Sequence, residues 1–291
     1  YHYALSTIPK GAYASKYRYN LGWRNTDNRA FSFWFRPTYN KPIGKNVLIT
    51  QISNNTGDVM FTTSGLPTGS DALVPGDWIS VRGTNSYNGI QKVKSVDEAT
   101  DTVTLDLNYI DNVMMPTAKF SHEVSNKMIR YHNNAAQPVD YFEITYTTNW
   151  FIIKVNNVYH KFDLSKESLV LKKGEWYAAV ININNLANQL SLFLYTPVEI
   201  AGAINPDRTA NLTKSYVKTL TVNSMSAPDL HDWSIMGCQS DLTNIRIWSD
   251  PIEEELQELI LSQYVVKDSH LALVIDNASP ELLLPTATNP R

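Results

Sequence analysis

The sequence contains a single cysteine, Cys238, among its 291 residues. One cysteine cannot close a disulfide bond within the chain, so the fold must be stabilised by the packing of its core. Secreted animal domains usually carry several cysteines, and we therefore expect a microbial or viral source. A chain of this length that is 43% hydrophobic can bury a substantial core.

Long hydrophobic runs and dense basic runs are also absent. The longest apolar stretches, 190–195 and 271–275, are far shorter than the roughly 20 residues that span a bilayer. The 25 basic residues are outnumbered by 28 acidic ones and form no cluster that would track a phosphate backbone. We therefore expect no membrane insertion and no nucleic-acid partner.

The motifs of cofactor and nucleophile chemistry are missing. There is no Gly-x-Ser-x-Gly elbow, no Gly-x-Gly-x-x-Gly loop and no Walker sequence, and the six histidines lack a short ligand spacing. Asp229, Asp232 and Asp241 are calcium candidates by position near the closing strand, but we interpret them as solvated loop acids. No cofactor and no metal site is predicted.

One stretch, 138–143, is similar to the active strand of sandwich-fold glycoside hydrolases, which carries Glu-x-Asp-x-x-Glu. Asp140 and Glu143 match the last two acids, whereas Pro138 replaces the nucleophile. Because proline cannot form a glycosyl ester, we interpret this stretch as a strand edge with two solvated acids. We expect no enzyme activity.

What the sequence does contain is period-two alternation of aromatic and β-branched residues, which predicts strands. Phe31, Phe33 and Phe35 share one face of a strand that Pro37 closes. Further strands are predicted at 47–52, 141–146, 150–155, 176–183, 190–195 and 271–275. Asn-rich turns at 147–149 and 184–188 predict two hairpins. The fold class is therefore all-β.

One helix is predicted from Asp250 to about Tyr264, with Ile252, Leu256, Leu259 and Ile260 forming its apolar face. An Asp-Pro start followed by acidic residues is typical of a helix N-terminus.

Almost ninety residues separate the second strand from the strand at 141–146, too many for a loop of a compact sandwich. Within this interval, a strand is predicted at 78–81, a type I′ turn at Asn88-Gly89 and a further strand at 103–105. We predict a small inserted SH3-like β-barrel at 58–115, with a discontinuous sandwich formed by 1–57 and 116–291.

Three blocks resemble the laminin-G-like or concanavalin-A-like jelly-roll sandwich. They are FSFWFRP at 31–37, GEWYAAV at 174–180 with LSLFLY at 190–195, and LTNIRIW at 242–248 leading into PIEEE at 251–255. The expected fold is thus an all-β, laminin-G-like jelly roll with an inserted barrel and one short C-terminal helix.

The segment 76–89 of the insert resembles short β-barrel repeats of tailed-bacteriophage structural proteins, and the stretch 252–278 is similar to phage virion proteins that carry this sandwich. These resemblances imply a non-enzymatic virion structural protein, located in the virion as part of a tail, neck or head appendage. Its expected partners are other virion proteins, further copies of itself and surface glycans. The alternative is a lectin-like carbohydrate-binding module for host-surface glycans.

Exposed aromatic residues bind sugar faces and partner proteins. Trp23, Trp78 and Trp233 lie near predicted turns and are the surface candidates. The remaining tryptophans lie in predicted strands and are expected in the core: Trp34, Trp150, Trp176 and Trp248. The tyrosine-rich start, 1–19, is either an arm that packs on a neighbouring subunit or an extra strand of the sandwich.

Overall fold

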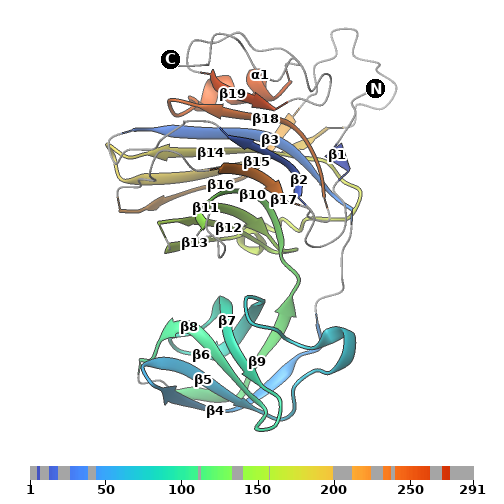
Figure 1. Cartoon of the computed structure of the whole chain (residues 1–291), viewed down its shortest axis with the longest axis vertical. Helices are drawn as coiled ribbons and strands as arrows, with labels where there is room; N and C mark the ends of the chain where they lie inside the picture. The colour runs from blue at the N-terminus through green and yellow to red at the C-terminus, as the bar shows by residue number, and fades with distance from the viewer. Residues whose placement is uncertain are drawn as a thin grey trace. The chain divides into compact units, whose positions relative to one another are not determined.

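The computed structural model describes residues 5–6, 13–18, 27–38, 44–110, 113–132, 140–156, 158–198, 212–223, 232–236, 240–262 and 271–275. The chain divides into two compact units (Figure 1). One contains Tyr1–Tyr39 and Asn126–Arg291, and the other contains Asn40–Ser125.

In the residues that the structure describes, the first unit is a sandwich of two antiparallel sheets. The seven-stranded sheet has the order β1 (Leu5–Ser6), β18 (Ser240–Trp248), β3 (Arg29–Pro37), β14 (Tyr177–Asn184), β15 (Gln189–Pro197) and β16 (Leu212–Thr221), with β19 (Leu271–Ile275) pairing with β18. The six-stranded sheet has the order β13 (Val158–Asp163), β12 (Trp150–Val155), β11 (Asp140–Tyr146), β10 (Asn126–His132), β17 (Asp232–Met236) and β2 (Tyr13–Arg18). The predicted all-β jelly-roll sandwich is confirmed, and 13–18 of the tyrosine-rich start forms a strand.

The core lies between the two sheets. Phe31, Phe33 and Phe35 are fully buried there, as the alternation predicted. The ring of Phe31 stacks on that of Phe142 with centroids 4.6 Å apart, which joins β3 to β11 across the sandwich. Both predicted hairpins are confirmed, because β11 pairs with β12 and β14 pairs with β15.

Helix α1 (Glu254–Ser262) covers the outer face of the seven-stranded sheet. It begins four residues later than predicted, and its apolar face differs from the expected one. Ile260 is buried as predicted, whereas Leu256 and Leu259 are 44% and 51% exposed. The inward position is taken by Gln257, whose Oε1 accepts a 2.7 Å hydrogen bond from the Tyr195 hydroxyl. This polar contact orients the helix in a way that apolar spacing alone does not predict.

The second unit is a closed barrel, with the order β4 (Val47–Asn55), β5 (Asp58–Thr63), β8 (Thr102–Asn108), β7 (Gly89–Asp97), β6 (Trp78–Thr84) and β9 (Met114–Glu123). A short 3-10 helix, η1 (Gly69–Asp71), precedes β6, and a second, η2 (Leu164–Glu167), follows β13 in the sandwich. The predicted boundaries, 58 and 115, fall inside the barrel. The strand predicted at 47–52 as part of the sandwich is part of β4 and belongs to the barrel, because alternation predicts a strand without identifying its partner.

The predicted turn at Asn88-Gly89 joins β6 to β7 but is not of type I′. Only Gly89 of the pair has a positive φ, at 99°, and Asn88 Oδ1 instead accepts a 2.9 Å hydrogen bond from the Thr84 amide. The two consecutive positive φ values that a type I′ turn requires occur between β4 and β5, at Thr56 and Gly57 (50° and 99°).

Candidate binding surfaces

The structure changes the assignment of the tryptophans. Trp23 lies outside the described residues. Trp233 lies in β17, where its backbone pairs with Tyr131, but the structure does not describe its side chain. Trp78 is only 2% exposed, so its prediction as a surface residue is wrong. It begins β6, where the strand register places it between Lys92 of β7 and Glu123 of β9.

The tryptophans expected in the core also divide into two groups. Trp248 is buried, with its indole nitrogen 3.0 Å from Ser32 Oγ. Trp34, Trp150 and Trp176 are only partly buried, because each lies on the outer face or at the end of a sheet. Sequence alternation places these side chains on a strand but does not reveal what covers the outer face.

Arg36 links Trp176 to Asp241 at one end of the seven-stranded sheet. Its Nε donates a 2.8 Å hydrogen bond to Asp241 Oδ2, and a second guanidinium nitrogen also contacts this oxygen. The guanidinium carbon lies 4.9 Å from the centroid of the Trp176 ring. Asp241 is 4% exposed, so its interpretation as a solvated loop acid is wrong. It is a strand residue that neutralises Arg36.

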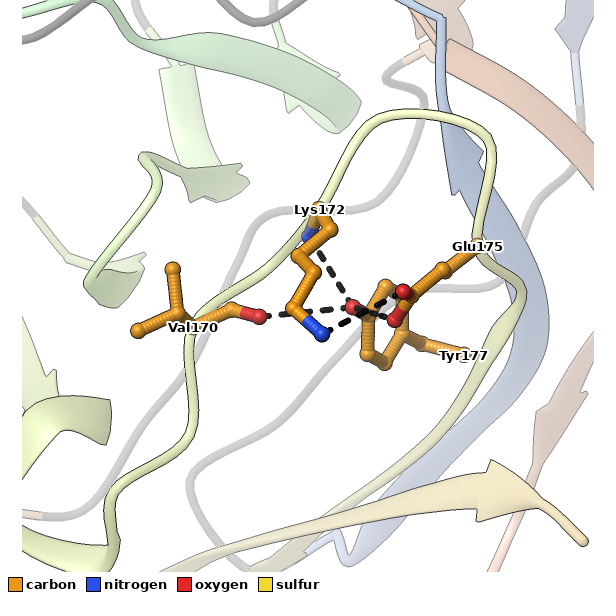
Figure 2. A network of polar contacts seen from close by, with 4 residues as sticks. All are labelled: Val170, Lys172, Glu175 and Tyr177. Carbon is orange, nitrogen blue, oxygen red and sulfur yellow. Dashed lines mark hydrogen bonds and ion pairs between the residues drawn. The ribbon is translucent and has the colours of Figure 1, made fainter.

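The Tyr177 hydroxyl holds together the loop that leads into β14, as Figure 2 shows. It accepts a 2.9 Å hydrogen bond from the Lys172 amide and lies 3.0 Å from Glu175 Oε2 and 3.4 Å from the Val170 carbonyl oxygen. Glu175 in turn forms an ion pair with Lys172. Burial, and secondarily the nearby Glu175, raises the pKa of Tyr177 to about 12. The hydroxyl is therefore protonated at neutral pH and serves to hold the loop.

Glu143 lies in the middle of the six-stranded sheet, on the face that points away from the core. It is 5% exposed, its Oε1 accepts a 2.6 Å hydrogen bond from Thr145 Oγ1, and its Oε2 lies 2.6 Å from Lys127 Nζ. Strand β11 has partners on both sides, so the prediction of a solvated acid at a strand edge is wrong for Glu143. Pro138 lies outside the described residues, as does the side chain of Asp140.

Basic side chains surround Glu143 on this outer face. Strand register places Glu143 between Arg130 of β10 and Lys154 of β12. The neighbouring row contains Lys127 and, on β13, Lys161. Side chains of the intervening positions point into the core instead. We call Lys127, Arg130, Lys154 and Lys161 the cationic sheet face.

Sequence reasoning missed this surface because the four residues come from three strands, two of which, β10 and β13, were not predicted. Lys127 and Arg130 are three positions apart in β10, and β12 and β13 contribute one lysine each, so no local pattern indicated this surface. Two partly exposed aromatic residues, Trp150 and Tyr159, lie on the same face, and Lys154 Nζ is 5.5 Å from the centroid of the Tyr159 ring.

Three exposed apolar residues of the barrel follow β8 or lie at the start of β9, and we call them the barrel tip: Ile110, Val113 and Met115. Their side chains are 59%, 71% and 55% exposed. The backbone of Ile110 is fixed by the buried Tyr87, whose hydroxyl accepts a 2.7 Å hydrogen bond from the Ile110 amide and also contacts its carbonyl oxygen. Tyr87 thus holds the backbone at the Ile110 end of the barrel tip.

Among the ranges that the structure describes, no group of three His, Cys, Asp or Glu side chains is arranged to hold a metal ion. None of the helices in these ranges has the length and apolar character needed to cross a membrane.

The sequence matches no protein-family model and no curated protein. Several solved structures match, two of which are named here. A native heptameric SAP-like pentraxin from Limulus polyphemus matches with a TM-score of 0.30 and 8% identity, over 82% of this chain and 82% of that one. The LG4-5 domains of the mouse laminin alpha1 chain match with a TM-score of 0.24 and 10% identity, over 83% of this chain and 88% of that one. Both TM-scores are low, so no property of either protein is transferred to this chain.

Proposed function

We propose that the chain is a non-enzymatic structural module of a bacteriophage virion, where it acts in assembly or attachment through protein contacts. The observation that carries this proposal is the barrel tip, since its three apolar side chains are exposed and the buried centre of a protein interface is rich in apolar side chains. The resemblance of segment 76–89 to repeats of phage structural proteins supports the same function. Other virion proteins and further copies of the chain are the proposed partners.

The experiment combines mass spectrometry of purified particles with a tip variant. The protein is expected in the particles, and Val113→Asp with Met115→Asp in the phage genome is expected to reduce its incorporation. A matched control changes two apolar residues of the sandwich, Val158→Asp and Leu186→Asp, which are 53% and 76% exposed. Absence of the unmodified protein from particles rejects the virion function. Equal incorporation of both double variants rejects the tip as the contact.

A second candidate function is glycan binding at the outer face of the six-stranded sheet. The observation that favours it is the pair of partly exposed aromatic residues, Trp150 and Tyr159, beside polar and charged side chains. Calorimetry with neutral and acidic oligosaccharides tests it. Trp150→Ala is expected to weaken binding, whereas Trp176→Ala, whose ring Arg36 already contacts, is expected to leave it unchanged. Absence of heat with every oligosaccharide rejects this function.

A further inference from the structure

We propose that the barrel of one copy of this chain binds helix α1 of a second copy, so that the copies associate head to tail. This inference rests on the proposed virion function above, and it names the partner of the barrel tip as a further copy of the same chain. The argument compares the charged and apolar side chains of the two surfaces.

Two cations lie side by side on the outer surface of the barrel. Arg82 of β6 is directly opposite Lys119 of β9. Their sequence neighbours Val81 and Phe120 belong to the barrel core, so both cationic side chains point away from that core. Arg82 is exposed and Lys119 is partly exposed, and neither side chain has a hydrogen bond or ion pair to the residues that the structure describes. Because like charges that are directly opposite destabilise a sheet, carboxylates supplied by a partner would relieve this repulsion.

Exposed apolar side chains flank the cation pair. Leu48 of β4, which is 41% exposed, is opposite Lys119 on the other side of β9. Met115 of the barrel tip precedes Lys119 by four residues in β9, so it lies on the same face and about 13 Å along the strand. Thr117, between them, is exposed, whereas Ser121 on the far side of Lys119 is buried. The open surface therefore extends from the cation pair towards the barrel tip.

Helix α1 presents the complementary combination of side chains to solvent. Its solvent face consists of four exposed residues: Glu255, Leu256, Glu258 and Leu259. Glu255 and Glu258 are three residues apart, which makes them neighbours on the helix surface, so their like charges repel. Neither carboxylate has a cation partner in the part of the chain that the structure describes. The two glutamates, like the two cations of the barrel, are therefore available to a partner of opposite charge.

The two surfaces match in spacing and in length. The Cβ atoms of opposite residues in a sheet lie about 5 Å apart, and those of residues three apart on a helix lie about 5–6 Å apart. Each of the two glutamates can therefore meet one cation. A helix of 9 residues is about 13 Å long, which equals the separation of Lys119 and Met115 along β9. Leu256 and Leu259 can thus contact Leu48 and Met115 while the charges pair.

The contact is heterologous because the two surfaces differ. Two barrel surfaces facing each other would bring Arg82 and Lys119 against the same cations of the second copy, and two α1 faces would oppose their glutamates. A barrel surface paired with an α1 face avoids both repulsions. Each copy can then bind two neighbours, so the association continues into a ring or a filament.

The test is sedimentation equilibrium of the full chain over a series of protein concentrations. The barrel variant is Arg82→Glu/Lys119→Glu, and the helix variant is Glu255→Lys/Glu258→Lys. In either variant alone both surfaces carry the same sign of charge, so we expect association at least about tenfold weaker than that of the unmodified chain. An equimolar mixture is expected to associate again, because the barrel of each variant then meets a helix of opposite charge. This recovery also verifies that both variants are folded.

The matched control is Lys166→Glu/Lys218→Glu, which makes the same change of charge at exposed positions of the sandwich and is expected to associate like the unmodified chain. High salt is expected to weaken the association of the unmodified chain, since it screens the paired charges.

Four results overturn the inference. A control variant as weak as the barrel variant, or a barrel variant as strong as the unmodified chain, overturns the location of the contact. A mixture that stays monomeric overturns the pairing of the barrel with α1. Association that is insensitive to salt overturns the role of the charges. An unmodified chain that is monomeric at every concentration overturns self-association, whereas the virion function depends on the separate measurement of incorporation into particles.

Discussion

The indole nitrogen of Trp34 donates a 3.0 Å hydrogen bond to the main-chain carbonyl oxygen of Leu261, 227 residues further along the chain. The preceding carbonyl, that of Ile260, accepts a 2.8 Å hydrogen bond from Arg246 Nη1. The last carbonyl groups of a helix have no partner within the helix. Side chains from β3 and β18 therefore complete the C-terminal turn of α1 and fasten it to the sheet.

Trp34→Phe is expected to lower the free energy of unfolding by about 1–2 kcal/mol, because it removes the donor to the Leu261 carbonyl while keeping most of the ring. Urea denaturation of the full chain measures this loss. Trp150→Phe is the matched control, since the Trp150 indole is partly exposed and makes no hydrogen bond to the residues that the structure describes. A smaller loss for Trp34→Phe than for Trp150→Phe would contradict the capping role.

The ion pair between Lys127 and Glu143 predicts a non-additive pair of substitutions. Lys127→Met is expected to destabilise the fold by roughly 1–3 kcal/mol, because it leaves the buried Glu143 carboxylate with Thr145 but without its cation. Adding Glu143→Gln is expected to restore most of this loss. Urea denaturation of both single variants and the double variant gives the coupling energy. If the losses of the two single variants simply add up to that of the double variant, the coupling energy between Lys127 and Glu143 is zero and the prediction is wrong.

Two glycines of the barrel with similar backbone conformations are expected to respond differently to alanine. Gly83 (φ +81°) lies in β6, where an added Cβ would be 2.9 Å from the Ala118 Cα. Gly76 has φ +97°, but no atom lies within 4 Å of an added Cβ. Gly76→Ala is expected to cost about 1 kcal/mol from backbone strain alone, and Gly83→Ala clearly more. Hydrogen exchange of barrel amides measures both, and equal losses would contradict the role of the contact with Ala118.

The Tyr177 hydroxyl predicts a change of stability at alkaline pH. Its pKa is about 12 in the folded protein against 10.0 as the reference value, so the folded state retains the proton longer than the unfolded state does. The contribution of this group is complete below pH 10 and decreases as the pH rises from 10 towards 12. Tyr177→Phe is expected to cost about 1 kcal/mol at neutral pH and to make the alkaline decrease shallower. Urea denaturation at a series of pH values checks this, and parallel curves would rule the prediction out.

Much of the sandwich could be predicted from the sequence because its central strands are buried on at least one face. Phe31, Phe33 and Phe35 alternate with less apolar residues, and the hairpins are closed by short Asn-rich turns. The predicted last strand, 271–275, has the same limits as β19. Strand β16 was missed because it is an edge strand rich in Thr and Lys, and an exposed edge does not need a regular apolar pattern.

The candidate binding surfaces were less predictable for a different reason. Lys127, Lys154 and Lys161 are unremarkable in their own segments, and only the pairing register brings them onto one face. The exposure of a tryptophan likewise depends on tertiary packing, since Trp78 lies beside a predicted turn and is nevertheless 2% exposed. Strand pairing is non-local, so the local pattern does not determine it.

Strand β3 pairs with β14 on one side and with β18 on the other, and both partners follow the barrel in the sequence. During synthesis, β3 emerges from the ribosome before the barrel does, while its partners emerge long after. The six barrel strands, by contrast, are contiguous in the sequence and pair only among themselves. The barrel can therefore complete its folding first. At that stage β3 has no strand partner and its apolar face is still exposed to solvent. Until those partners emerge, Phe31, Phe33 and Phe35 are open to aggregation and to chaperone binding.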